Sequence, residues 1–176
     1  RQNTKSQIIY LIMMNIQVSL KVEIMIVRDI KCYDGDLIHH RFAYRFFKDK
    51  TLPIGNILAF RAPMHVEADG MIDNEDILNN DYIYSDDAIN FVWEIPGVDS
   101  FGAVAWQRLF NTRIATLLHE HIQAPIEVDG DDLMVHKEHD QHGIIQQKGK
   151  CSVSITYTRD GAALGHTAIN VTAGKK

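Results

Sequence analysis

The amino-acid sequence predicts an α+β fold in which a mixed, mainly antiparallel sheet is flanked by helices. Apolar residues recur at i, i+3 and i+4 over residues 106–122, which predicts one long amphipathic helix. Most of the chain after Pro125 alternates or runs apolar between turn residues, which predicts consecutive strands. No internal repeat or low-complexity linker interrupts the pattern, so residues 22–176 are expected to form a single domain.

The segments that precede the long helix alternate between strands and helices. Residues 22–27 are β-branched and apolar, which predicts a strand buried on both faces. Asp34-Gly35-Asp36 predicts a turn, after which Asp36 can cap a helix that continues to Phe47. Residues 54–60 predict a second strand, and residues 64–66 predict a short third one.

Polar and acidic residues separate these strands from the β-rich end of the chain. Residues 67–80 predict a loop with one helical turn, and Ser85-Asp86-Asp87 predicts the start of another helix, because acids favour a first turn. Asp99 or Ser100 is expected to cap the long helix, and Pro125 to end it. An antiparallel meander is expected to follow, with strands at residues 126–128, 133–135, 151–158 and 166–172 and turns at residues 129–131 and 159–161.

The two ends of the chain leave alternatives open. Residues 1–21 form an N-terminal extension, for which upstream sequence and an extra edge strand are the two interpretations. Residues 174–176 follow the last expected strand directly, which leaves room for a missing C-terminal element.

Composition narrows the classes of partner. A net charge of −5 without a clustered basic face argues against nucleic-acid binding. The apolar run at residues 8–14 is far shorter than the roughly 20 residues that a membrane span needs. Cys32 and Cys151 are expected to be buried free thiols, which fits a reducing, cytoplasmic location. A small-molecule ligand is the expected partner, and exposed β edges make a homodimer a second expectation.

Lys150 is the strongest candidate for an anion-binding residue. It stands beside an expected strand, where a lysine is costly to bury unless an anion pairs with it. A solvated lysine next to a glycine-bearing loop is the alternative. Asp132 can contact a ribose, a metal-bound phosphate or Lys150, although the hairpin turn alone also explains an aspartate there.

The last third of the chain resembles the biotin and lipoate protein ligases. The resemblance is carried by Asp131-Asp132-Leu133, by Lys150 with the hydroxyl-bearing strand after it, and by Ala168-Ile169-Asn170-Val171. It implies a biotin/lipoate ligase-like fold, ATP and Mg²⁺ as cofactors, and joining of a small carboxylate to a nucleotide.

The same resemblance implies roles for single residues. Lys150 would stabilise the charge that develops during adenylation, and Asp132 would orient a ribose or Mg²⁺. Ser152, Ser154, His166 and Asn170 would line the ligand pocket. Arg61 would hold phosphate. However, Ala62-Pro63 stands where the ligases have a glycine-rich loop, and proline offers no N–H to a phosphate.

A longer stretch, about residues 22–172, resembles the domain-of-unknown-function family numbered 366. That family shares the fold of the biotin/lipoate ligases and class II synthetase cores, and its activity is not established. The segments that carry the likeness are His40-Arg41-Phe42-Ala43-Tyr44-Arg45, Ala59-Phe60-Arg61-Ala62-Pro63, Met71-Ile72-Asp73-Asn74-Glu75-Asp76, Tyr84-Ser85-Asp86-Asp87 and Ser152-Val153-Ser154-Ile155.

Two further groups of side chains are candidates for ligand or metal binding. His40, Arg41, Tyr44 and Arg45 form a polar and aromatic helix face, which can grip a planar ligand by stacking and an anion contact or can simply be solvated. His136, His139 and His142 stand three residues apart, a spacing that zinc ligands use, although a polar hairpin tip explains them equally.

Three functions therefore compete. The first is a pocket for a small carboxylated or nucleotide-like ligand with acyl-adenylate ligase or transferase chemistry, the second is a non-catalytic binding module of the same fold, and the third is a metal-dependent hydrolase. The missing glycine-rich loop favours the binding module over the ligase, and Lys150 and Asp132 favour a charged ligand.

Overall fold

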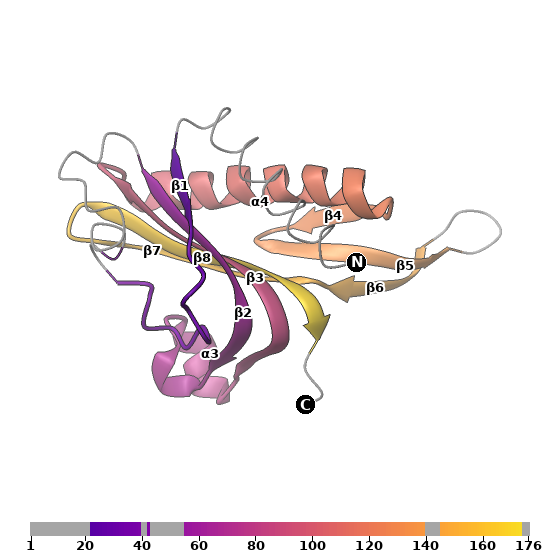
Figure 1. Ribbon diagram of the computed structural model, residues 1–176, viewed down its shortest axis with the longest axis horizontal. Coiled ribbons are helices and arrows are strands. Elements are labelled where there is room, and N and C mark those ends of the chain that lie inside the picture. The colour runs from indigo at the N-terminus through magenta and orange to yellow at the C-terminus, as the bar shows by residue number, and fades with distance from the viewer. Residues whose placement is uncertain (1–21, 40–41, 43–54, 140–144, 174–176) are drawn as a thin grey trace.

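The computed structural model describes residues 22–39, 42, 55–139 and 145–173. Its larger sheet has five strands in the order β1-β2-β3-β8-β7, and it is strongly curved (Figure 1). β1 pairs with β2 in parallel, and every other pairing in this sheet is antiparallel. The strands are β1 (Glu23–Ile26), β2 (Asn56–Val66), β3 (Ile83–Pro96), β7 (Ser152–Arg159) and β8 (Ala162–Ala173).

A smaller antiparallel sheet has the order β4-β5-β6, with β4 (Ile126–Asp129), β5 (Asp132–His139) and β6 (Ile145–Lys150). The long helix α4 (Ser100–Ile122) lies beside this sheet and across one face of the larger one (Figure 1). On the opposite side of the larger sheet lie a short 3₁₀ turn, η1 (Ala68–Gly70), and helix α3 (Asn74–Asn79). The predicted α+β class, with mixed and mainly antiparallel sheets, is thus confirmed.

Both ends of α4 follow the predicted capping chemistry. Asp99 is the N-cap, and its side chain accepts a hydrogen bond of 2.8 Å from the Gly102 amide. Gln123 ends the helix in the left-handed region at φ 54°, two residues before Pro125. The apolar stripe of the helix, which includes Phe110, Ile114 and Leu117, is buried against the sheets.

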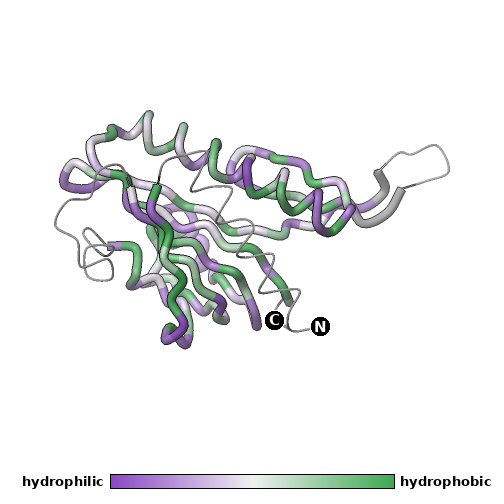
Figure 2. Tube along the Cα trace, turned by 45° about the horizontal axis from the view of Figure 1, so that its top comes forward, coloured by the Kyte–Doolittle hydropathy of each residue, from purple (hydrophilic) through white to green (hydrophobic). Residues whose placement is uncertain are grey.

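The larger sheet is buried on both faces because each face has its own apolar core. On one side, Ile57, Phe91 and Trp93 pack against α4. On the other side, Leu58, Phe60, Met64, Val92 and Leu164 pack with residues that precede β2. Figure 2 shows apolar residues running through the strands between these layers. The two central strands, β3 and β8, therefore have nearly continuous apolar segments instead of an alternating pattern.

This double burial explains why the helix predicted to start at Ser85-Asp86-Asp87 is wrong. These residues belong to the 14-residue strand β3, whose register shifts at Ser85 and Asp87. The acids lie at the irregular end of the strand, and the apolar run after them is buried on both faces, so no alternation marked it as a strand.

Two other predicted strands differ in detail. The strands predicted at residues 54–60 and 64–66 correspond to one strand, β2 (Asn56–Val66), which passes Pro63 at a register shift between Ala62 and Met64. Such a shift tolerates a residue without an N–H. The first strand exists as predicted but is not buried on both faces. Among the described strands β1 pairs with β2 alone, and its residues are exposed or half-buried.

The β-rich end follows the predicted order, with one strand added. The turns at residues 129–131 and 159–161 connect β4 to β5 and β7 to β8, with Gly130 and Gly161 at positive φ. Strand β6 was not predicted. Cys32 and Cys151 are free, but Cys32 is exposed and Cys151 only half-buried, contrary to the buried thiols expected. Within the described ranges, no helix is long and apolar enough to span a membrane.

Candidate functional site

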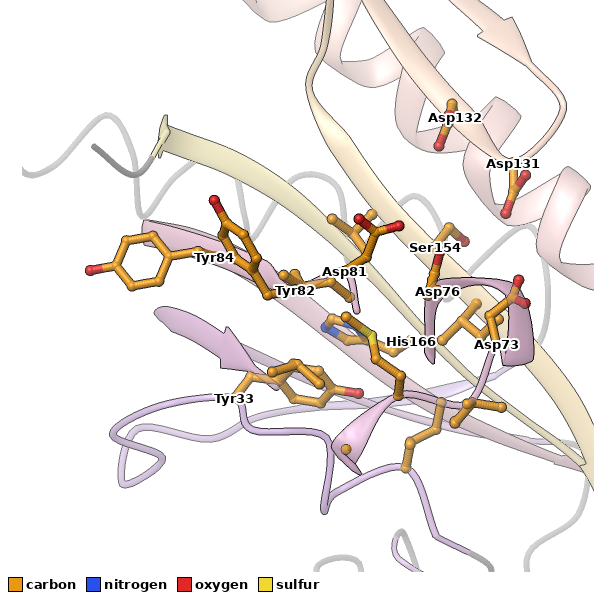
Figure 3. Close-up of a pocket in the computed structure, with 18 of the residues that line it drawn as sticks. Tyr33, Asp73, Asp76, Asp81, Tyr82, Tyr84, Asp131, Asp132, Ser154 and His166 are labelled. Carbon is orange, nitrogen blue, oxygen red and sulfur yellow. The ribbon is translucent and has the colours of Figure 1, made fainter. Parts of the chain in front are cut away.

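A cavity of about 460 Å³ opens on the side of the larger sheet that α4 does not cover. Its floor includes Tyr33, Ile155 and His166. Its walls are formed by residues 70–84 and by the place where the start of β5, the end of β6 and the start of β7 lie together. Figure 3 shows these segments, which are far apart in the sequence, converging on one space.

The walls of the cavity carry a high density of carboxylates. Five aspartates line it, namely Asp73, Asp76, Asp81, Asp131 and Asp132, whereas Lys150 is the single lysine or arginine among the described lining residues. Asp73 also caps α3 by accepting a hydrogen bond of 2.9 Å from the Glu75 amide. Partial burial raises the pKa of Asp76, and the negative charges of Asp73 and Asp81 raise it further.

His166 is the buried polar group of the floor, with 1% of its surface exposed. Its Nε2 lies 3.0 Å from Asn90 Oδ1 on the neighbouring strand. Its ring stacks on Tyr33, with centroids 3.7 Å apart and planes inclined by 17°. Burial lowers the pKa of His166 to about 3, so the imidazole is neutral at physiological pH.

The hydrogen bonds of Asn90 fix the tautomer of this histidine. The Asn90 amide nitrogen donates to the carbonyl oxygens of Ala62 and Ala88, at 3.2 and 3.3 Å. Because those oxygens only accept, the amide oxygen must be the atom that faces His166. His166 Nε2 therefore carries the proton and donates, which leaves Nδ1 as an acceptor.

Lys150 and Asp132 form an ion pair at the rim, with 2.8 Å between Nζ and Oδ1. The lysine side chain is 53% exposed, at the end of β6, and not a buried strand lysine. Asp131 is 3.5 Å from Arg108 Nη1 on α4. Sequence analysis placed Lys150 and Asp132 in one site, and the structure brings them together.

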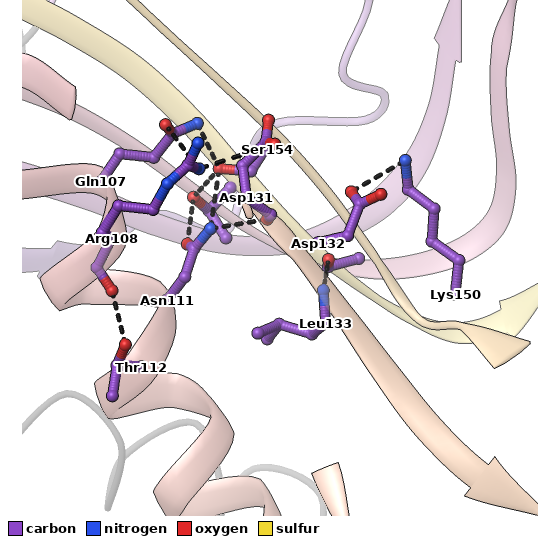
Figure 4. A network of polar contacts seen from close by, with 11 residues as sticks. Gln107, Arg108, Asn111, Thr112, Asp131, Asp132, Leu133, Lys150 and Ser154 are labelled. Atoms are coloured by element: carbon purple, nitrogen blue, oxygen red, sulfur yellow. Dashed lines mark hydrogen bonds and ion pairs between the residues drawn. The ribbon is translucent and has the colours of Figure 1, made fainter. Parts of the chain in front are cut away.

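Ser154 holds α4 against the sheet behind this rim (Figure 4). Its hydroxyl oxygen accepts from Gln107 Nε2 at 3.0 Å and from Asn111 Nδ2 at 3.2 Å, and it lies 2.9 Å from Thr167 Oγ1. Thr167 donates its hydroxyl proton to Asn111 Oδ1, so Ser154 must donate to Thr167. The Ser154 hydroxyl then has no further hydrogen-bonding capacity. Asn111 Nδ2 also donates to the Asp131 carbonyl at 2.8 Å. Ser154 thus lines the cavity but acts by positioning the Asp131 turn.

Three other predicted pocket residues are placed elsewhere. Ser152 is fully buried and accepts a hydrogen bond of 2.8 Å from the Leu133 amide. Arg61 and Asn170 line a second cavity of about 320 Å³, which is mainly apolar and includes Leu118, Ile122 and Val171. Arg61 donates hydrogen bonds to both carboxylate oxygens of Asp87, and this contact raises the pKa of Arg61.

The remaining predicted residues cannot be assigned to either cavity. His40, Arg41, Tyr44 and Arg45 lie outside the described residues, as does His142. His136 is 3.0 Å from Glu127 Oε2, and Lys148 is 2.6 Å from the same oxygen. In the described portion of the chain, no group of three His, Cys, Asp or Glu side chains has the geometry to hold a metal ion.

The cavity wall opposite Lys150 was not predicted from the sequence. Asp76, Asp81, Tyr82 and Tyr84 all line the cavity, and so does Tyr33. The acidic composition of residues 67–81 was visible in the sequence. Nothing in the local sequence indicated that this segment faces the start of β5 and the end of β6 across the cavity.

The chain matches the family model "Domain of unknown function (DUF366)" over residues 22–176. The comparison with curated proteins gives no match. Among solved structures, a protein of unknown function from Pyrococcus horikoshi is similar, with a TM-score of 0.70 and 25% identity, over 86% of this chain and 74% of that one.

Two lipoate-related proteins share the fold more distantly. P. falciparum LipL1, solved in complex with lipoate, has a TM-score of 0.51 and 12% identity, over 88% of this chain and 49% of that one. A bipartite lipoate protein ligase from Thermoplasma acidophilum has the same score and identity, over 86% of this chain and 62% of that one. The chain thus spans about half of the former protein and less than two thirds of the latter.

The family match covers all of the described residues, whereas the likeness to the lipoate proteins shows the fold alone. The chain has a fold similar to that of the lipoate protein ligases and belongs to the DUF366 family.

Proposed function

We propose that this protein binds a small molecule in the cavity between the larger sheet and residues 70–84, with Lys150 and Asp132 contacting a polar end of the ligand. The observation that carries the proposal is the convergence of three distant segments on one 460 Å³ space, within the range that small-molecule sites occupy. Those segments bring charged rims, a neutral buried histidine and aromatic rings to the same place.

Lys150 is suited to exchange its partner for a ligand. Its ion pair with Asp132 is largely exposed, and exposed pairs contribute only about 0–1 kcal/mol. A carboxylate or phosphate group on a ligand can therefore displace Asp132 at small cost. A ligand carboxylate that reached the lysine would gain a charged hydrogen bond in a more enclosed setting.

The described lining does not fit ATP. A triphosphate needs several cations or converging backbone N–H groups, and five aspartates with one lysine repel it. Arg61, the expected phosphate contact, lines the other cavity and is engaged by Asp87. The proposal is therefore binding of a ligand without adenylation, and ligase chemistry is the competing function.

Lys150→Ala is expected to weaken binding of a carboxylate-bearing ligand by about 1.5–3 kcal/mol, the scale of a hydrogen bond to a charged group. Lys148→Ala is the matched control, because Lys148 is on the same strand and pairs with Glu127 outside the cavity. Binding of a panel of small acids, nucleotides and organic cations would be measured by amide chemical-shift titration. Equal losses in both variants, or none in either, would remove Lys150 from the site.

A pyrophosphate-release assay with ATP and the same acids separates binding from ligation. Binding without pyrophosphate release is expected. Release with any acid, abolished by Lys150→Ala and kept by Lys148→Ala, would instead establish adenylation and contradict the binding-only proposal.

A further inference from the structure

No positively charged side chain among the described residues pairs with the carboxylates of Asp73, Asp76 and Asp81. In the described part of the chain, Lys150 is paired with Asp132 and Arg108 with Asp131, and no cation forms a salt bridge with Asp73, Asp76 or Asp81. Burial raises the pKa of Asp76, and the negative charges of Asp73 and Asp81 raise it further, an effect that Lys150 offsets only in part. This wall of the cavity therefore favours a positively charged or N–H-bearing group.

The floor of the cavity has the same preference for a second, independent reason. His166 Nε2 donates to Asn90, so its Nδ1 is an acceptor. Within the described residues, Nδ1 makes no hydrogen bond, and His166 is almost fully buried while lining the cavity. Because His166 lines the cavity and its Nδ1 has no donor among the described residues, a donor on the ligand can bind this nitrogen.

Aromatic rings complete this end of the site. Tyr33 stacks on His166, and Tyr82 and Tyr84 also line the cavity (Figure 3). Aromatic faces attract organic cations through the ring quadrupole, and inorganic ions gain less because they hold their water shell. Rings beside unneutralised carboxylates are the combination that binds amidinium, guanidinium and ammonium groups.

We infer that the ligand carries an organic cation, of the amidinium, guanidinium or amine class, which binds between Asp76, Asp81 and His166. The inference rests on the proposed function of the cavity and specifies its ligand. It differs from the acids expected of a ligase-like pocket, because the acid-binding element is confined to Lys150 at the rim. A ligand with a basic nitrogen at one end and an anionic group at the other satisfies both ends of the site.

The test uses three probes of the same shape: benzamidine, benzamide and benzoate. Each is titrated into the ¹⁵N-labelled full chain and followed through the amide signals of residues 70–84 and 150–155. Saturable shifts there are expected with benzamidine, with affinity about tenfold above that of benzamide or benzoate, the scale of one charged contact.

Variants localise the contact. Asp76→Asn is expected to weaken benzamidine binding about tenfold, whereas Glu75→Gln removes the same charge from the same helix outside the cavity and is expected to leave it within about twofold. His166→Gln keeps a donor toward Asn90 but loses the Nδ1 acceptor, and it is also expected to weaken binding. Retained unfolding cooperativity shows that each variant is folded.

The outcomes separate this inference from the proposed function. If benzoate or a nucleotide shifts these signals and benzamidine does not, the inferred cationic ligand is wrong, and the proposal that the cavity binds a ligand stands. If Mg²⁺ or Ca²⁺ alone saturates the same signals while benzamidine fails, the site takes an inorganic ion and the inference is also overturned. If no member of the whole panel shifts them, both the inference and the proposed function fall.

Discussion

The tautomer of the buried His166 depends on a residue that is far away in the sequence. The residue lies on the cavity floor, where sequence analysis placed it, but its tautomer is set by Asn90, 76 residues earlier in the chain. The tautomer could not be predicted, because it depends on which carbonyl oxygens the Asn90 amide meets across β2 and β3. Because of those contacts, His166 Nδ1 on the cavity floor is a hydrogen-bond acceptor and not a donor.

The neutral His166 predicts an acid-sensitive fold. Its pKa is about 3 in the folded state, against 6.5 in an exposed reference, so protons bind preferentially to the unfolded chain between these values. The histidine's contribution is complete above about pH 6.5 and is lost as pH falls, by about 1.4 kcal/mol per unit. Urea unfolding at about pH 7.5 and about pH 5 measures this loss. His166→Gln should reduce it by about 2 kcal/mol, and an identical loss in both proteins would contradict the assignment.

For Lys150, in contrast to His166, the partner was expected from the sequence and the exposure of the side chain was not. The resemblance to the ligases implied a common site for Lys150 and Asp132, and the two residues do meet at the cavity rim. Its exposure was not predictable, because it depends on where β6 ends relative to β7. The lysine is available to ligand without the energetic cost of a buried charge.

At the scale of elements, β3 and β8 depend on a close approach of backbone to an aromatic ring. Gly165 is directly opposite Trp93, and a Cβ at Gly165 would lie 2.0 Å from the indole. Trp93 is fully buried, so its ring has little room to move.

Gly165→Ala is therefore expected to destabilise the protein by about 1–3 kcal/mol through overpacking, measured by urea denaturation. Trp93→Leu removes the ring that clashes, so adding it to Gly165→Ala should give a total smaller than the sum of the single losses. Strict additivity of the two substitutions would show that the clash is not the cause.

The junction of α4 with β7 is the second element-scale feature. Asn111 connects α4 to Ser154, Thr167 and the Asp131 carbonyl from a fully buried position. Asn111→Ala should cost about 1–3 kcal/mol, because it leaves buried partners unsatisfied. It should also shift the amide signals of Asp131 and Asp132. Thr112→Ala, the exposed neighbour on the same helix, is the control, and a loss of equal size there would refute a special role for Asn111.

Elements with a clear hydrophobic periodicity were predictable from the sequence. Strands that are buried on both faces were not. The amphipathic pattern and Asp99 cap gave α4 nearly to the residue. Strand β3 was partly mistaken for a helix because the strand is buried on both faces and has two acids, Asp86 and Asp87, near its start. Strand β6 was missed because Gln147, Lys148 and Gly149 carry no apolar alternation, and β6 is instead defined by pairing with β5.

At the scale of the whole molecule, the side of the sheet decides which residues share a site. Successive residues of a strand point to opposite faces. In β2, Ile57 and Ala59 contribute to the core beneath α4, whereas Leu58 and Phe60 contribute to the other core. Arg61 continues the first series and lines the cavity on that side, so it is separated from Lys150 although sequence order suggested a common pocket.

The cavity wall that includes Asp76 and Asp81 is likewise a property of the assembled fold. Its acidic composition is visible in the sequence, but its position opposite Lys150 depends on the sheet order, which places β2 and β3 between the edge strand β1 and the β8–β7 hairpin. The sequence therefore supported a charged pocket, and only the fold revealed that most of its charge is negative.

The central claim is that this cavity is the ligand site of the protein. Amide chemical-shift mapping of the ¹⁵N-labelled chain with the mixed panel of acids, nucleotides and organic cations tests it most directly. The predicted result is saturable perturbation confined to residues 70–84, 131–132 and 150–155, with organic cations binding most tightly. Perturbations that instead centre on the Arg61 and Val171 cavity, or that appear nowhere with any member of the panel, would contradict the claim.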